Sequence, residues 1–345
     1  MADGALPARQ IEATSLTNQG EFGPENGLAD HLGIDYVAVS SPVRRIRQES
    51  FRPVRVPREG GLTSGPIKVG HGTMSMTLEV YKVPTGQTWV TLRCNPSRLA
   101  DPDGWRLVTI VPALQYLSAA WSMIAEFVEP SRRLPSATLS RLDVTRDFNG
   151  ILLPRRYVRS LADAPSDTRG GIRGYSKAFR DRGDSLYWGN RSGQARLYDK
   201  HLETRGRAAH GTLRWEVESR RPWCVEHGIR VVHDITPASV VHLARNIWRR
   251  SGMGTPVTSL PQFVKDVMTD PKVSDTEVRG LLGWLLAESY GANIAPKGKD
   301  TMKKYRDIVS RHGVPTLFQE CNHDGWPVHG RLDLDTGEEV LHATL

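Results

Sequence analysis

The chain has 345 residues, with 46 Lys and Arg against 38 Asp and Glu, a formal net charge of +8 and a pI near 9.5. This length fits about two domains, each able to bury a core. The three cysteines form no Cys-x-x-Cys pair, which argues against a cysteine zinc site and a disulfide framework. With no apolar run of about 18 residues and no secretory signal, we expect a cytoplasmic protein without a membrane span.

The N-terminal half alternates between irregular and strand-like segments. Residues 1–30 contain few large apolar side chains and are predicted to be disordered. Further along, period-two alternation predicts strands, and a spacing of three to four residues predicts one helix. The expected elements are strands at Ile34–Ser40, His71–Tyr81 and Thr85–Arg93, a helix at Pro112–Phe127, and a strand at Ser140–Phe148.

The densest pattern lies between Ser185 and Glu218, where three short strands are predicted. They are Ser185–Trp188, Ala195–Lys200 and Thr212–Glu218. Because side chains alternate between the two faces of a strand, the second and third strands each have one apolar and one polar face. The polar faces carry Arg196, Tyr198 and Lys200 in one strand and Arg214, Glu216 and Glu218 in the next.

The strand at Ser140–Phe148 repeats this design. Leu142 and Val144 share its apolar face. Its polar face carries Arg141, Asp143, Thr145 and Asp147. This pattern is typical of an antiparallel sheet that packs on one side and is open on the other. We therefore expect the polar faces to meet in one site that processes a phosphate group.

From Thr236 onward the pattern becomes helical. The predicted helices are Pro237–Arg249, Leu260–Thr269, Ser274–Ala287 and Lys297–His312. The expected fold is α+β, with an antiparallel sheet covered by helices on one face and a smaller C-terminal helical domain. The expected division is residues 1–30 disordered, 31–232 the sheet domain, 233–321 the helical domain and 322–345 a polar tail.

Positive charge is concentrated around the expected site. Residues 141–221 contain 18 Lys and Arg against 10 Asp and Glu, a surplus equal to that of the whole chain. Such a concentration favours a polyanionic partner, because phosphate contacts dominate the non-specific binding of nucleic acids. A solvated basic surface is the alternative interpretation of charge alone.

Four short motifs follow one another through this part of the chain. They are Arg141-Leu142-Asp143, Leu186-Tyr187-Trp188-Gly189-Asn190-Arg191, Arg196-Leu197-Tyr198-Asp199-Lys200 and Arg214-Trp215-Glu216-Val217-Glu218. In sequence and order, the motifs resemble those of the Rep_trans (replication initiation factor) family of rolling-circle replication initiators, found in plasmids, phages and conjugative elements. The resemblance covers residues 34–232 in outline and does not extend to the helical C-terminus.

The resemblance implies a DNA strand-nicking and rejoining enzyme whose sheet domain is similar to those of HUH endonucleases and RRM folds. A tyrosine would attack a DNA phosphate and stay bound to the 5′ end, while the freed 3′-hydroxyl primes replication. The chain has no His-x-His triplet, so carboxylates would have to hold the metal, Mg²⁺ or Mn²⁺. The expected partners are single-stranded or cruciform origin DNA, duplex DNA at the C-terminal domain, a host helicase and a second copy of the chain.

Chemistry and motifs together suggest a nucleophile. A phenol with a pKa near 10 needs neighbouring cations to become reactive, and Arg196 and Lys200 flank Tyr198 on its predicted face. Tyr198 is therefore the predicted nucleophile, assisted by Arg196 and Lys200. Tyr187 is its main competitor and Tyr175 a weaker one.

The carboxylates and remaining arginines receive the other roles. The predicted metal ligands are Asp143 and Glu216, with Glu218 or Asp147 as a third, and the predicted DNA contacts are Arg141, Arg191 and Arg214. The competing interpretation is ordinary ion pairing of Arg141 with Asp143 and of Arg214 with Glu216. Two other functions stay open: a non-catalytic origin-binding protein, and a hydrolytic metal-dependent nuclease in which water attacks.

Overall fold

The structure is a computed structural model. It describes residues 26–47, 53–55, 62–64, 67–68, 76–100, 106–151, 154, 157–158, 161, 172–174, 185–255, 257–289, 298–316, 329–332, 334–335 and 339–341. Most of the segment predicted to be disordered, residues 1–25, lies outside this range, as do residues 71–75 of a predicted strand and Tyr175. Within the described residues, no helix has the length and apolar character needed to cross a bilayer.

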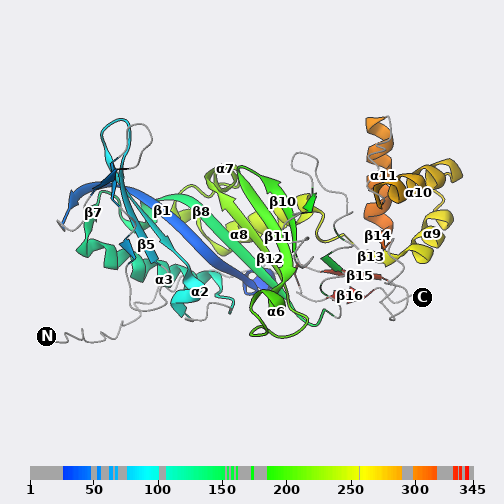
Figure 1. Ribbon diagram of the computed structural model, residues 1–345, viewed down its shortest axis with the longest axis horizontal. Coiled ribbons are helices and arrows are strands. Elements are labelled where there is room, and N and C mark those ends of the chain that lie inside the picture. The colour runs from blue at the N-terminus through cyan, green and yellow to red at the C-terminus, as the bar shows by residue number, and fades with distance from the viewer. Residues whose placement is uncertain are drawn as a thin grey trace.

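A large twelve-stranded sheet dominates the molecule, and all of its described strand pairs are antiparallel (Figure 1). Its order is β2-β3-β5-β6-β1-β8-β12-β11-β10-β9, with β4 paired to β5 and β7 to β1. The strands are β1 (Leu32–Ile46), β2 (Pro53–Arg55), β3 (Leu62–Ser64), β4 (Ile67–Lys68), β5 (Met76–Lys82), β6 (Thr88–Cys94), β7 (Val128–Pro130), β8 (Thr138–Phe148), β9 (Ile172–Gly174), β10 (Ser185–Asn190), β11 (Gly193–Asp199) and β12 (Leu213–Arg220).

Helices lie before, between and after the strands of this sheet in the sequence. They are α1 (Asn26–Ala29), α2 (Pro96–Ala100), α3 (Ile110–Met123), α6 (Lys200–Glu203), α7 (Arg221–Glu226), α8 (Pro237–Ser251), α9 (Leu260–Thr269), α10 (Asp275–Ser289) and α11 (Lys299–His312), with 3₁₀ turns η1 (Ile124–Glu126), η2 (Leu134–Ser136) and η4 (Val232–Asp234). These elements confirm the predicted α+β class. The predicted disorder is wrong at residues 26–29, because α1 forms there and packs against α8 with Leu28 buried.

The apolar face of the central strands forms the core. Phe148 of β8 and Trp215 of β12 both contact Trp248 of α8, at ring-centroid distances of 5.4 and 5.3 Å. Each such aromatic pair adds about 1 kcal/mol beyond the area it buries. Figure 1 shows α8 behind β8 and β12, so this helix covers the sheet rather than belonging to a separate helical unit after residue 232.

Local sequence fixes the two ends of α8. Pro237 occupies the first helical turn, where its missing N–H is no loss, and the Thr236 hydroxyl accepts a hydrogen bond from Ser239 N at 3.2 Å. Gly252 ends the helix in the left-handed conformation at φ 69°. The predicted helix at Pro237–Arg249 is therefore confirmed, with two further residues at its end.

The C-terminal part combines helices with a second sheet. The strands β13 (Val257–Ser259), β14 (Val314–Thr316), β15 (His329–Leu332) and β16 (Glu339–Leu341) form a mixed sheet in the order β14-β13-β15-β16. Each strand is three or four residues long, too short to show alternation in the sequence. The predicted helices α9, α10 and α11 are confirmed to within two residues at each end.

Candidate functional site

The register of the central strands arranges polar side chains in rows across one face of the sheet. Arg196 of β11 lies opposite Tyr187 of β10 on one side and Glu216 of β12 on the other. Residues directly opposite each other in an antiparallel pair share a face, with Cβ atoms about 5 Å apart. The first row is therefore a tyrosine, an arginine and a glutamate.

A second row runs parallel to the first, two residues along each strand. Glu218 lies opposite Gln194 of β11 and Asp143 of β8, and Asp143 in turn lies opposite Tyr36 of β1. The row thus joins two carboxylates that are 75 residues apart in the sequence. Tyr36 had no predicted role, and only its place in an expected strand could have suggested one.

A small cleft of about 80 Å³ opens between these rows. It is lined by Arg141, Tyr187, Gln194, Arg196, Glu216 and Glu218. Five of these six residues lie in the four motifs, and the sixth, Gln194, lies just before the motif that starts at Arg196. The cleft has room for a few water molecules, or for one ion and part of its hydration shell. We call it the carboxylate cleft.

Asp143 lies opposite Glu218, one of the residues that line the carboxylate cleft, and is only 2% exposed. Arg141 donates to both of its oxygens, at 2.8 and 2.5 Å, and lies 3.1 Å from Glu218. Burial raises the pKa of Asp143 to about 7; the Arg141 hydrogen bond and charge oppose this shift, and Glu216 and Glu218 add to it. The predicted ion pair between Arg141 and Asp143 is therefore present, in a crowded acidic environment.

Glu216 is similarly occupied. The Arg196 guanidinium donates to it at 2.5 Å and the Tyr198 hydroxyl at 3.2 Å, and Glu216 is 4% exposed. The Arg196 guanidinium carbon also lies 4.9 Å from the centroid of the Tyr198 ring. The carboxylate thus joins the two motif residues that were expected to act together.

Tyr198 is more deeply placed than its alternation pattern predicted. The residue is 5% exposed, and burial, reinforced by the charge of Glu216, raises its pKa well above 10. The prediction that its ring faces solvent is wrong, because the row of large polar side chains around it covers the face. In this structure Tyr198 is a neutral phenol that donates to Glu216.

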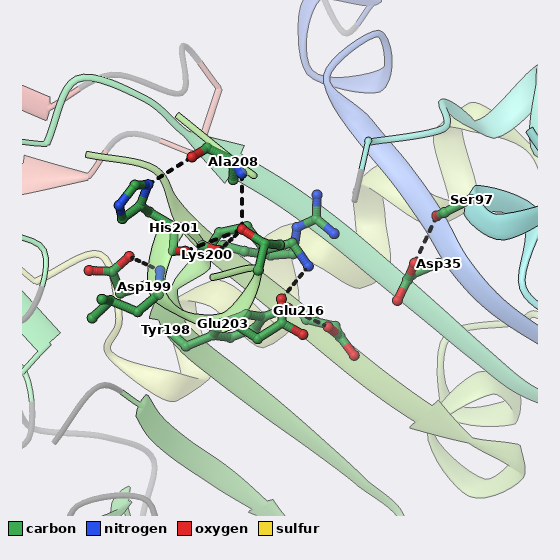
Figure 2. A network of polar contacts seen from close by, with 12 residues as sticks. Asp35, Ser97, Tyr198, Asp199, Lys200, His201, Glu203, Ala208 and Glu216 are labelled. Carbon is green, nitrogen blue, oxygen red and sulfur yellow. Dashed lines mark hydrogen bonds and ion pairs between the residues drawn. The ribbon is translucent and has the colours of Figure 1, made fainter. Parts of the chain in front are cut away.

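Lys200 also differs from its prediction. Strand β11 ends at Asp199, whose carboxylate caps α6 by accepting from Leu202 N at 3.1 Å, so Lys200 begins a helix. Its ammonium nitrogen is 2.7 Å from Glu203 and 5.7 Å from the Tyr198 ring centroid. Figure 2 shows Lys200 and Glu203 of α6 close to Tyr198 and Glu216.

The other predicted DNA contacts separate into an exposed and a buried group. Arg191 is exposed at the tip of the β10–β11 hairpin. Arg214 is 1% exposed, and its guanidinium donates to both oxygens of Asp147 at 2.6 and 2.7 Å. Arg214 therefore pairs with Asp147 rather than with Glu216, and its burial is at odds with the predicted DNA contact.

The carboxylates do not form a ready-made metal site. Among the residues that the structure describes, no group of three or more His, Cys, Asp or Glu side chains is arranged to hold a metal ion. Nevertheless, Glu216 and Glu218 both raise the pKa of Asp143, as mutually repelling carboxylates do. Such an oxygen-donor set has the chemistry of a Mg²⁺ or Mn²⁺ site, provided that the arginines release it.

Comparison with known proteins finds a distant structural likeness. No protein-family model matches the sequence, and no curated protein matches it. Among solved structures, the chain is similar to one described as a rolling circle replication initiator protein from Geobacillus stearothermophilus, with 15% identity and a TM-score of 0.31, over 80% of this chain and 96% of that one. A likeness with so low a TM-score carries no argument about function.

Proposed function

We propose that the protein nicks and rejoins one strand of DNA and so initiates rolling-circle replication. The observation that supports this function most strongly is the carboxylate cleft, which brings Tyr187, two arginines and two glutamates to one small space beside Asp143. The four motifs that resemble the Rep_trans family provide all the catalytic groups around it. The proposed substrate is single-stranded or cruciform origin DNA in the cytoplasm.

The geometry favours Tyr187 over Tyr198 as the attacking residue. Tyr187 is half-buried and lines the carboxylate cleft, where a phosphate can approach it. Tyr198 is nearly inaccessible, and its raised pKa makes the phenolate hard to form. In the proposed mechanism Tyr198 is a positioning residue that holds the Glu216 carboxylate in place.

The chemical step would exchange one phosphodiester for another. A carboxylate of the cleft takes the proton of the Tyr187 hydroxyl, and the phenolate oxygen attacks the scissile phosphorus. The bond from phosphorus to the 3′ oxygen breaks, and that oxygen takes up the proton to become a free 3′-hydroxyl. Because the product retains a phosphodiester, the reverse step rejoins the strand.

The arginines would change partners when DNA binds. Arg141 and Arg196 neutralise Asp143 and Glu216 in this structure, and both guanidiniums are about one-third exposed. A DNA phosphate in the cleft could draw them away and receive their preorganised positive charge. A Mg²⁺ or Mn²⁺ ion held by Asp143, Glu216 and Glu218 would polarise the scissile phosphate.

A gel assay of covalent adducts would test this function. Wild-type protein and the Tyr187→Phe and Tyr198→Phe variants are incubated with Mn²⁺ and single-stranded DNA that covers the region encoding the protein, labelled at its 3′ end. Because the tyrosine would hold the 5′ side of the break, the label should migrate with the protein on a denaturing gel. We expect no adduct with Tyr187→Phe and a reduced yield with Tyr198→Phe.

The matched control is Tyr116→Phe, which changes a half-buried tyrosine of α3 outside the cleft and should leave the adduct intact. A full adduct with Tyr187→Phe and none with Tyr198→Phe would return the nucleophile to Tyr198. Cleaved DNA without any adduct in the wild type would indicate a hydrolytic nuclease. Gel shifts of duplex DNA with no break, insensitive to chelator, would indicate a non-catalytic origin-binding protein.

A further inference from the structure

The polar face of the large sheet continues beyond the carboxylate cleft onto β1 and β6. Tyr36 of β1 lies opposite Asp143, and Arg93 and Trp89 of β6 lie opposite Ala38 and Pro42 of β1. Because side chains two, four and six residues apart in a strand share a face, all three point to the same side as Asp143. The apolar side chains Val90, Leu92 and Cys94 point to the other side and are buried.

On this extension, a guanidinium group lies over each of two aromatic rings. The Arg141 guanidinium carbon lies 4.5 Å from the Tyr36 ring centroid, and that of Arg132 lies 6.0 Å from the Trp89 ring centroid. Both rings are half-buried, so each keeps part of its surface open to solvent. Arg132 is held across the face by a hydrogen bond to Thr138 at 2.8 Å.

We propose that this extension, formed by Tyr36, Trp89, Arg93, Arg132 and Arg141, binds the single-stranded DNA that flanks the scissile phosphate. Flat aromatic rings give bases a stacking surface, and arginines beside them follow the phosphates. Arg141 connects the carboxylate cleft to this extension, because it lines the cleft and also lies over the Tyr36 ring. This proposal rests on the proposed function only in naming the bound DNA as the strand that is nicked; the binding of single-stranded DNA does not depend on nicking.

The dimensions suit several nucleotides. Strands β12 and β6 are three spacings apart in the sheet, which is about 14 Å, and six residues separate Tyr36 from Pro42 along β1, which is about 20 Å. The diagonal from Glu218 to Trp89 is therefore roughly 24 Å. A stacked strand rising about 3.4 Å per nucleotide would place about seven nucleotides along it.

The test measures binding rather than catalysis. Fluorescein-labelled oligo(dT) of about 16 nucleotides is titrated with wild-type protein and with Trp89→Ala, in the presence of chelator and at one fixed ionic strength. We expect the variant to bind about 5- to 160-fold more weakly, the range that loss of one stacked base produces. Trp89→Phe should recover most of the affinity, because it keeps an aromatic surface.

Two controls separate stacking from general damage. Trp121→Ala removes a partly buried tryptophan from α3, away from this face, and should bind oligo(dT) as the wild type does. A duplex of the same length, which exposes no base faces, should bind Trp89→Ala and the wild type equally. Circular dichroism and urea midpoints show that each variant is folded.

The result that would overturn the inference is wild-type affinity of Trp89→Ala for oligo(dT), or an equal loss for oligo(dT) and duplex. Because the chelator stops metal-dependent cleavage, this outcome does not depend on whether the protein nicks DNA. Weaker oligo(dT) binding by Trp89→Ala, together with an adduct formed by the wild type in the gel assay, would support both proposals. Loss of binding with no adduct in the wild type would leave the binding surface standing without the nicking function.

Discussion

The buried pair of Arg214 and Asp147 offers the sharpest test of the site architecture. Asp147→Ala removes the carboxylate that accepts two hydrogen bonds from a guanidinium only 1% exposed. Breaking a buried ion pair from one side costs about 3–5 kcal/mol, because the remaining charge stays desolvated. The side chain of Asp147 is 20% exposed, so water can enter after its removal and lower the cost to about 3 kcal/mol.

Removing both charges should cost less than removing one. In Asp147→Ala/Arg214→Met the buried position is apolar, and we expect at least about 1 kcal/mol of the loss to be recovered. Urea unfolding followed by circular dichroism gives each free energy of unfolding. The control is Glu129→Ala, which removes a carboxylate from an exposed pair 3.7 Å from Arg47 and should cost less than about 1 kcal/mol.

A free energy of unfolding for Asp147→Ala within about 0.5 kcal/mol of the wild-type value would show that the buried pair does not stabilise the sheet. A double variant no more stable than the single one would show the same. The same double variant also addresses function. Because Arg214 is buried against Asp147, we expect its replacement to leave oligo(dT) affinity unchanged when the protein is folded. A large loss of affinity would restore the predicted DNA contact.

Two further predictions concern the carboxylate cleft and its hairpin. Because the pKa of Asp143 is raised from 3.8 to about 7, the folded state binds more protons than the unfolded state between these values. The free energy of unfolding of the wild type, relative to that of Asp143→Asn, should therefore fall by on the order of a few kcal/mol as pH rises from about 4 to about 7, and then level off. Parallel curves of unfolding free energy against pH for the two proteins would contradict this. Gly193→Ala should lower the free energy of unfolding by about 1–3 kcal/mol, because the added Cβ would meet the Trp223 ring and lie 2.7 Å from the Glu218 carbonyl oxygen. An unchanged urea midpoint would be inconsistent with this packing.

The sequence predicted the face of each residue well because alternation is a local property. In β8 and β12 the apolar and polar sets are those expected from period-two spacing, and Asp143, Glu216 and Glu218 do share one face. Likewise, Pro237 and Thr236 marked the start of α8 correctly.

The sequence could not predict how deeply each side chain is buried or which carboxylate each arginine pairs with. It placed Tyr198 and Tyr187 in neighbouring motifs as competing candidates, and only the packing of the whole face shows that one is 5% exposed and the other lines the cleft. It offered Glu216 as the partner of Arg214, whereas the antiparallel register brings Asp147 opposite that arginine.

The sequence by itself therefore determined the polarity of each strand and the residue types available for chemistry, because both depend on neighbours one or two residues away. The tertiary structure decided which arginine neutralises which carboxylate, and which tyrosine a phosphate can reach. These depend on the register between strands about 75 residues apart, such as Asp143 with Glu218, and on burial, which no local pattern encodes.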